Sequence, residues 1–270
     1  MFRFIKWLFR YTMWFVVHIP FRLLFPTRIV NRKRFLTRKS IIFGNHTSGL
    51  DPVLLWTRLL WRTYFIAKKE LFKGWFLGGL GILKTLGAFP VNRQGTDIEA
   101  VKTGLKVLRR GFRLVLFPEG TRKAEGSEMG EVKNGVAMFA LKTQTLVTPV
   151  FILRKPKMFR RNRFFVGKPI SLEHLYDRRV NKETIELASV YLTEKFNELR
   201  TESLEFVKRK NPRLYKKVVL LDESPYTESA PTNADVVETN VESAPTNIES
   251  VTNVDVVEIE AENIETNADE

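Results

Sequence analysis

Cysteine is absent from this chain of 270 residues, and histidine occurs only three times, at His18, His46 and His174. Without cysteine there is no disulfide framework, no thiol nucleophile and no thiolate metal site, which fits a reducing compartment. The three histidines lie too far apart in sequence to have the spacing of metal ligands. We therefore expect no metal site.

Acidic residues are missing from residues 1–50, which hold ten Lys/Arg. They are concentrated in residues 222–270, which hold 14 Asp/Glu and no Lys/Arg. Residues 1–221 therefore carry 44 Lys/Arg against 16 Asp/Glu, a net charge of +28, whereas the whole chain carries +14. So basic a region predicts an anionic partner, which could be a nucleic acid, a membrane surface or a phosphorylated substrate.

A long uncharged run is also missing from the apolar N-terminus. The longest one, from Tyr11 to Phe21, has eleven residues, whereas a membrane-spanning helix needs roughly 20. Because aromatic residues and cations alternate here, we predict that residues 1–30 form a helical anchor lying in one leaflet. No small-residue cleavage site follows, which disfavours a cleaved signal peptide. The basic residues at 28–39 fit an anionic lipid surface, with a solvated linker as the alternative.

Apolar runs and helical patterns alternate in the rest of the chain. Strands are predicted at residues 40–44, 63–67, 88–91, 113–117, 146–153 and 163–167, and helices at residues 51–60, 97–110, 132–142 and 181–210. Thr96 and Glu99 have capping-box spacing before the second helix, and Gly111 ends it. The alternation predicts one α/β domain at residues 31–221, with a largely parallel central sheet flanked by helices. The repetitive acidic tail, residues 222–270, is predicted to be disordered.

The stretch from Asn45 to Asp51 lies where the first predicted strand turns into a helix. In one interpretation Asp51 is only a helix N-cap and His46 only a loop residue. In the other, Asp51 accepts a hydrogen bond from one ring nitrogen of His46, which leaves the second nitrogen free as a general base. The local sequence leaves both interpretations open.

Polar residues follow two further predicted strands. Arg93 comes after the strand at 88–91, and Glu119, Gly120, Thr121 and Arg122 come after the strand at 113–117. In open α/β sheets, ligands bind beyond the carboxyl ends of the strands. We therefore expect these residues to share one pocket with His46 and Asp51.

The sequence resembles the glycerolipid acyltransferases, and in particular the bacterial 1-acyl-sn-glycerol-3-phosphate acyltransferases. The family's histidine–four residues–aspartate motif matches His46 to Asp51, and its Phe-Pro-Glu-Gly-Thr-Arg motif matches residues 117–122 in full. Residues 87–93 and 147–150 resemble the second and fourth motifs. The second motif fits only with one extra residue and has Asn92 in place of the usual acid. Lys123 stands where the family usually has serine.

The resemblance implies acyl transfer from an acyl thioester to an alcohol. His46 would be the general base and Asp51 would orient it. Backbone N–H groups around Gly120 and Thr121 would bind the oxyanion, while Glu119 would orient the same loop. No acyl-enzyme is expected, because the nearby Ser48 does not lie in a nucleophile elbow.

A phosphate-bearing acceptor needs cations, and the resemblance implies that Lys68, Arg93 and Arg122 supply them. The expected acceptor is lysophosphatidic acid, and the product is phosphatidic acid for phospholipid biosynthesis. The expected donor is acyl-CoA or acyl carrier protein, with no cofactor. We expect a monotopic or peripheral protein on the cytoplasmic face of the cell membrane.

Two alternatives remain open. One is an acyltransferase that acts on another glycerolipid acceptor, either glycerol-3-phosphate or a lysophospholipid. The other is a membrane-associated, basic nucleic-acid-binding protein. The sequence contains no zinc finger, basic zipper or RNA-binding aromatic pattern, so no nucleic-acid partner is expected.

Overall fold

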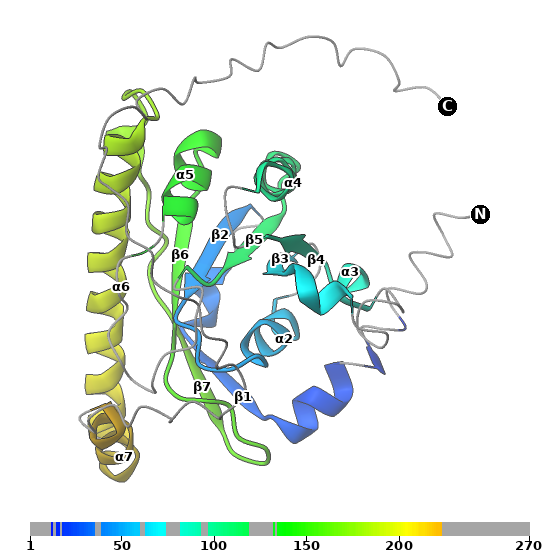
Figure 1. The fold of residues 1–270 in the computed structure, drawn as a ribbon. Helices are drawn as coiled ribbons and strands as arrows, with labels where there is room; N and C mark the ends of the chain where they lie inside the picture. Colours follow the sequence, from blue (N-terminus) through cyan, green and yellow to red (C-terminus); the bar gives the residue numbers. More distant parts are fainter. Residues whose placement is uncertain are drawn as a thin grey trace, which may run out of the picture. The chain divides into compact units, whose positions relative to one another are not determined.

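The computed structural model describes residue 12 and residues 15–16, 18–35, 39–59, 63–73, 82–92, 97–118, 132 and 134–222. Within these residues a seven-stranded sheet has the order β1-β7-β6-β2-β5-β3-β4 (Figure 1). Its strands are β1 (Thr27–Val30), β2 (Ser40–Gly44), β3 (Thr63–Lys68), β4 (Ala88–Val91), β5 (Arg113–Leu116), β6 (Val147–Ile152) and β7 (Asn162–Val166). Only the β6–β7 pair is antiparallel. The predicted α/β class with a largely parallel sheet is therefore confirmed.

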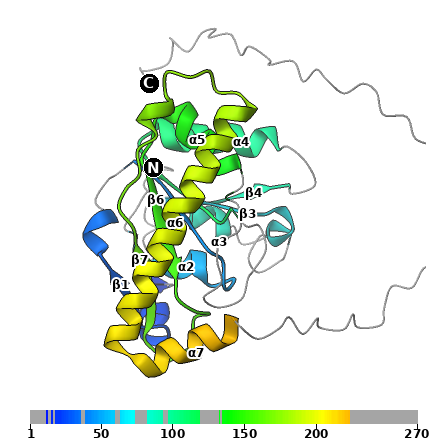
Figure 2. The same cartoon turned by 90° about the vertical axis from the view of Figure 1, so that its left-hand side faces the viewer.

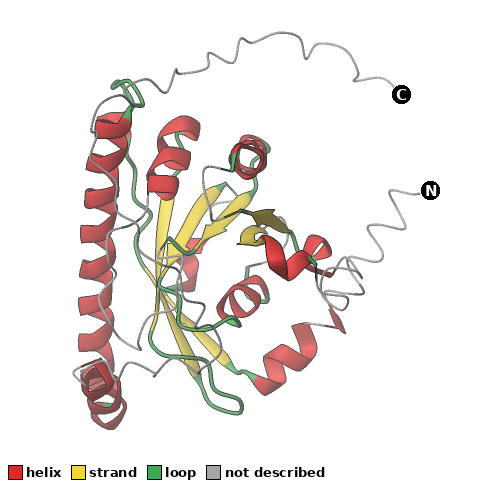
Figure 3. Cartoon of the chain, in the orientation of Figure 1, coloured by secondary structure: helices red, strands yellow, loops and turns green. Residues whose placement is uncertain are grey.

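Helices cover both faces of this sheet, as Figure 3 shows. The α-helices are α2 (Asp51–Trp56), α3 (Ile82–Thr85), α4 (Ile98–Arg109), α5 (Asn134–Thr143), α6 (Lys182–Lys210) and α7 (Pro212–Asp222). Short 3-10 helices are η1 (Arg32–Phe35), η2 (Lys69–Phe72) and η4 (Glu173–Leu175). Figure 2 shows the long α6 crossing in front of β6 and β7.

Successive residues of β2 point to two separate hydrophobic clusters. Ile41 and Phe43 pack with buried residues of α4, α5 and α6. Ile42 packs on the opposite face with Leu54 and Leu55 of α2. Because side chains alternate along a strand, a central strand covered on both faces must be apolar at every position. This is why Ile41, Ile42 and Phe43 form an unbroken apolar run.

The second predicted helix is capped one residue later than its sequence suggested. Asp97, and not Thr96, is the N-cap of α4, and its carboxylate accepts from the Ala100 N–H at 3.0 Å. Thr96 lies outside the described residues. The N–H groups of Asn92 and Ala100 hold the pKa of the Asp97 carboxyl below its usual range. Gly111 has a φ of +75° just after α4, as expected for a glycine that ends a helix.

Two elements correct the predicted domain boundaries. Residues 27–30, assigned to the N-terminal anchor, form β1 and pair in parallel with β7, so the sheet begins before residue 31. The helix α7 begins one residue after the C-cap position that ends α6, with Pro212 at its first position, and it was not predicted. Its last residue, Asp222, was assigned to the acidic tail. The rest of that tail, residues 223–270, lies outside the described residues.

Gly44 of β2 lies opposite Val150 of β6 and close to its backbone. A Cβ atom built on Gly44 would lie 2.4 Å from the carbonyl oxygen of Val150. We predict that Gly44→Ala lowers the free energy of unfolding by about 1–3 kcal/mol, the usual range for overpacking. Urea unfolding followed by circular dichroism measures this change.

The matched control is Gly135→Ala in α5, where a Cβ atom would meet nothing within 4 Å. Alanine favours helix over glycine by about 0.5–1 kcal/mol, so this variant should be as stable as the wild type or more stable. Equal unfolding curves for Gly44→Ala and the wild type would contradict the close approach of the two strands.

Candidate active site

The carboxylate of Asp51 is fully buried, with an exposed fraction of 0%. Its Oδ2 atom accepts from the backbone N–H groups of Thr47 at 2.7 Å and Ser48 at 2.6 Å. The Thr47 hydroxyl also lies 3.3 Å from both carboxylate oxygens. Buried charges need this kind of compensation, because an unpaired carboxylate in a protein interior is strongly disfavoured. The loop at residues 46–50 is thus wrapped around one carboxylate.

The same oxygen of Asp51 lies 3.0 Å from Nδ1 of His46. A carboxylate only accepts hydrogen bonds, so when Asp51 is ionised and His46 is neutral, Nδ1 carries the proton and Nε2 keeps its lone pair. The Nε2 atom has no hydrogen-bond partner among the described residues, and the His46 side chain is 15% exposed. This arrangement is suited to a general base with a fixed tautomer.

These contacts decide between the two interpretations of the motif. Leu50 holds the N-cap position of α2 and Asp51 is the first helical residue, with no side-chain capping bond into the helix. The carboxylate points back to the preceding loop instead. The interpretation of Asp51 as a simple N-cap is therefore wrong, and the predicted His46–Asp51 hydrogen bond is present.

Asn45 fixes the start of this loop to the neighbouring strand β6. Its side-chain amide donates to the Ile152 carbonyl at 3.0 Å, and its Oδ1 accepts from the Ile152 N–H at 2.8 Å. Both bonds are buried, and they continue the β2–β6 ladder by one residue after the strand ends. Sequence reasoning missed this role, because a polar residue after a strand does not reveal which distant backbone it will meet.

Phe117 joins the first motif to the third. β2 and β5 are paired in parallel, with Phe43 opposite Leu116, so both strands end at the same edge. Phe117 follows β5 directly, and its ring lies 4.5 Å from the His46 ring, centroid to centroid, at an interplanar angle of 30°. This ring contact limits how far the His46 imidazole can rotate. It was also missed, because Phe117 was assigned to the buried strand.

Lys68 ends β3, and β5 lies between β3 and β2. We refer to His46 and Asp51 as the dyad. Because adjacent strands are about 4.8 Å apart, the backbone of Lys68 lies about 10 Å from β2, the strand that leads to the dyad. Its side chain is 52% exposed, and Nζ lies 3.8 Å from a Glu70 carboxylate oxygen. The Lys68 side chain is therefore accessible to a ligand at the carboxyl ends of the strands, although it does not contact His46 or Asp51.

The other predicted site residues, Arg93, Glu119, Gly120, Thr121 and Arg122, lie outside the described residues. Their convergence on His46 stays a prediction. Within the described part of the chain, no group of three or more His, Cys, Asp or Glu side chains could hold a metal ion.

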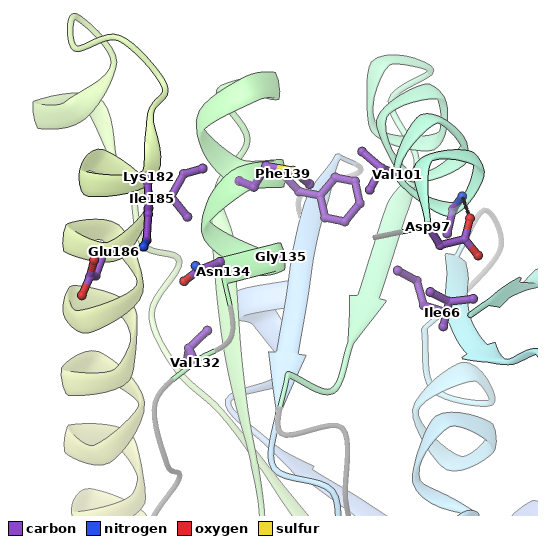
Figure 4. A pocket seen from close by; sticks show the side chains of 13 residues that line it. Ile66, Asp97, Val101, Val132, Asn134, Gly135, Phe139, Lys182, Ile185 and Glu186 are labelled. Atoms are coloured by element: carbon purple, nitrogen blue, oxygen red, sulfur yellow. Dashed lines mark hydrogen bonds between the residues drawn. The ribbon is translucent and has the colours of Figure 1, made fainter. Parts of the chain in front are cut away.

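An open groove of about 840 Å³ lies on the opposite face of the sheet from the dyad. Figure 4 shows Lys182, Ile185 and Glu186 of α6 on one side and Ile66, Val101 and Asp97 on the other, with Phe139 of α5 between them. Ile66 packs with the α4–α6 cluster, whereas Phe65 packs with α2. The groove therefore does not include His46 or Asp51.

Comparisons with known proteins agree with this geometry. The Acyltransferase family model matches residues 27–153, which include the dyad, Lys68 and the motifs at residues 87–93 and 117–122. The 1-acyl-sn-glycerol-3-phosphate acyltransferase of Streptococcus pneumoniae is 27% identical over 64% of each chain. The protein of that name from Borreliella burgdorferi is 31% identical over 51% of this chain and 55% of its own. In each case, less than two thirds of the relative is spanned.

One solved structure shares the fold. It is the 1-acyl-sn-glycerophosphate acyltransferase PlsC of Thermotoga maritima, with a TM-score of 0.50 and 22% sequence identity. The match covers 66% of this chain and 72% of that one. At this level of identity the likeness supports the fold.

We predict that Asn45→Ala lowers the free energy of unfolding by about 2–4 kcal/mol, because it leaves the buried N–H and carbonyl of Ile152 unpaired. Thermal or urea unfolding measures the change. Asn45→Asp keeps the size but loses the donor and places a charge beside the carbonyl, so it should be at least as destabilised. If both variants unfold like the wild type, Asn45 does not hold the loop to β6.

Proposed function

We propose that this chain, whose residues 27–153 match the Acyltransferase family model, moves a fatty acyl group from an acyl thioester to the sn-2 hydroxyl of 1-acyl-sn-glycerol-3-phosphate. The product is phosphatidic acid, made for phospholipid biosynthesis. The observation that carries the proposal is the 3.0 Å contact between His46 Nδ1 and the buried Asp51 carboxylate. It leaves Nε2 as the base that a hydroxyl nucleophile needs.

In the proposed reaction, His46 Nε2 takes the proton of the sn-2 hydroxyl as that oxygen attacks the thioester carbonyl carbon. The Asp51 carboxylate stabilises the imidazolium that forms. The tetrahedral intermediate then collapses, the carbon–sulfur bond breaks, and the imidazolium returns its proton to the leaving thiolate. Backbone N–H groups around Gly120 are proposed to bind the oxyanion, with Glu119 and Thr121 shaping that loop.

The acceptor phosphate is proposed to bind Lys68, Arg93 and Arg122. Lys68 lies on β3, within reach of a substrate whose hydroxyl is at the end of β2. An arginine fork fixes a phosphate in orientation as well as position. Two related acceptors, glycerol-3-phosphate and lysophospholipids, share this chemistry, and the donor is acyl-CoA or acyl carrier protein.

The proposed place of action is a membrane surface, on the cytoplasmic face, with the chain bound peripherally. None of the helices in the described parts of the chain is long and apolar enough to cross a bilayer. The strongly basic residues 1–221 are suited to anionic lipid.

We predict that His46→Ala lowers kcat at least about 100-fold, the lower bound for loss of a general base. Asp51→Asn should also lose most turnover, since the amide no longer fixes the productive tautomer. The assay uses lysophosphatidic acid and labelled acyl-CoA with purified protein.

Ser48→Ala is the matched control for the dyad. The Ser48 hydroxyl only accepts from the Leu50 N–H at 3.3 Å, so its removal should leave turnover within about threefold of the wild type, a difference below 1 kcal/mol. Loss of activity in Ser48→Ala together with normal activity in His46→Ala would replace the general-base mechanism with a serine nucleophile.

We predict that Arg122→Lys and Lys68→Gln each raise KM for the phosphorylated acceptor at least tenfold. Lysine keeps the charge of Arg122 but loses its bidentate fork, whereas glutamine removes the charge of Lys68, and a charge-assisted hydrogen bond contributes about 1.5–3 kcal/mol. With an acceptor that lacks the phosphate, the same variants should react at nearly the wild-type rate. Lys69→Gln, next to Lys68 in sequence, is the control. If the loss is the same with both acceptors, these cations do not bind the phosphate.

A further inference from the structure

The connection between β6 and β7 lies against the N-terminal helical segment, residues 18–24, as Figure 1 shows. The N–H of Phe159 donates to the Leu24 carbonyl at 2.7 Å, and the N–H of Asn162 donates to the Pro26 carbonyl at 2.8 Å. Two segments more than 130 residues apart in sequence are thus hydrogen-bonded to each other. They form one continuous surface.

Asn162 makes the end of this connection a tight, defined tip. Its side-chain Oδ1 accepts from the Lys157 N–H at 2.9 Å, and its amide donates to the Lys157 carbonyl at 3.2 Å. Asn162 is fully buried, whereas residues 157–161 are all exposed. The two hydrogen bonds between Asn162 and Lys157 therefore close the turn that presents residues 158–161 to solvent.

Large apolar side chains are exposed on both segments. Of the eleven exposed large hydrophobic residues in the described parts of the chain, four lie on these two segments, namely Ile19, Leu23, Met158 and Phe159. Ile19 and Leu23 are four residues apart and share one helical face. The other face of the same segment packs inward, since Phe21 and Leu24 contact the cluster that includes α2. An apolar face that stays exposed in the folded chain marks an interaction site.

Phe159 is the most unusual of these residues. Its side chain is 73% exposed and its φ is +52°. This left-handed conformation suits glycine or asparagine and is uncommon for a bulky side chain. Neither local backbone preference nor packing in the folded chain explains phenylalanine at this position, so the residue points to a function outside the fold.

Cations surround the apolar tip. Exposed basic residues lie on both sides of Met158 and Phe159, namely Lys155, Lys157, Arg160 and Arg161. Arg28 of β1 lies opposite Arg163 of β7 in the paired strands. Residues 1–50 and 132–172 contain no Asp or Glu. The pKa of Arg163 is lowered by burial and then by Arg154, Arg28 and Arg161. No ion pair within the described residues neutralises any of these arginines.

We propose that Met158 and Phe159 form a second membrane-docking element, which enters an anionic lipid surface together with the exposed Ile19 and Leu23 of the helical segment 18–24. The apolar side chains reach the acyl-chain boundary while the flanking arginines and lysines bind lipid phosphates. The proposal rests on the proposed function in one respect, the choice of a membrane as the surface that is bound. A lipid surface is favoured over an acidic protein because the helical face is apolar along its length, whereas the cations flank the tip.

The test is co-sedimentation of the full-length chain with vesicles of phosphatidylcholine and phosphatidylglycerol, without acyl donor or acceptor. Phe159→Asn should bind about tenfold to hundredfold more weakly, the range for withdrawing one large apolar side chain from lipid. Because asparagine tolerates a positive φ, the melting temperature of this variant should be equal to that of the wild type or higher. A weaker binder that is not less stable separates docking from folding.

Two further variants complete the experiment. Phe159→Trp should retain binding, since tryptophan is favoured at the membrane interface. Leu187→Asn removes a 45% exposed leucine from α6, outside the surface, and should bind like the wild type. Unchanged binding of Phe159→Asn, or an equal loss in Leu187→Asn, would overturn the proposal. So would a Phe159→Asn variant that keeps vesicle binding and loses binding to acyl carrier protein, because the tip would then dock a protein. Vesicle binding needs no turnover, so a failure of the proposed chemistry would be seen separately.

Discussion

The buried carboxylate of Asp51 is the interaction on which the rest of the site depends. One oxygen accepts from two backbone N–H groups and faces the His46 ring at 3.0 Å. Four residues between the histidine and the aspartate are enough for the backbone to wrap once around the carboxylate and bring the ring back to it. The spacing of the motif is therefore a geometric requirement, because a shorter or longer loop would change which N–H groups reach the carboxylate.

The sheet supplies the rigid frame for this loop. β2 lies between β5 and β6, and each neighbour contributes one contact to the motif. Asn45, which follows the end of β2, continues the ladder to Ile152 at the end of β6, while Phe117 after β5 lies against the imidazole. Gly44 permits the close approach of β2 to β6. A central strand with partners on both sides positions its C-terminal loop more firmly than an edge strand could.

One hydrophobic cluster connects the dyad to the proposed lipid-facing surface. Asp51 begins α2, and the buried Leu54, Leu55 and Trp56 of that helix pack in the same cluster as Phe25, just after the N-terminal helical segment. The β7 residues Phe164 and Val166, which follow the docking tip, belong to it as well. The helix that begins at Asp51 and the N-terminal helical segment thus pack on the same face of the sheet.

The sequence by itself determined the α/β class and most strands and helices, because the alternation of apolar runs and helical patterns is a local signal. It singled out His46 and Asp51 by their place at a strand-to-helix turn and by the family motif, and it left open whether they are hydrogen-bonded to each other. It could not determine that Asn45 pairs with Ile152, that Phe117 lies against His46, or that β1 belongs to the sheet. Each of these contacts joins residues far apart in the chain, and only strand order and register decide which residues meet. The same holds for Phe159, whose place beside Leu24 depends on the β6–β7 connection folding back onto the N-terminal segment.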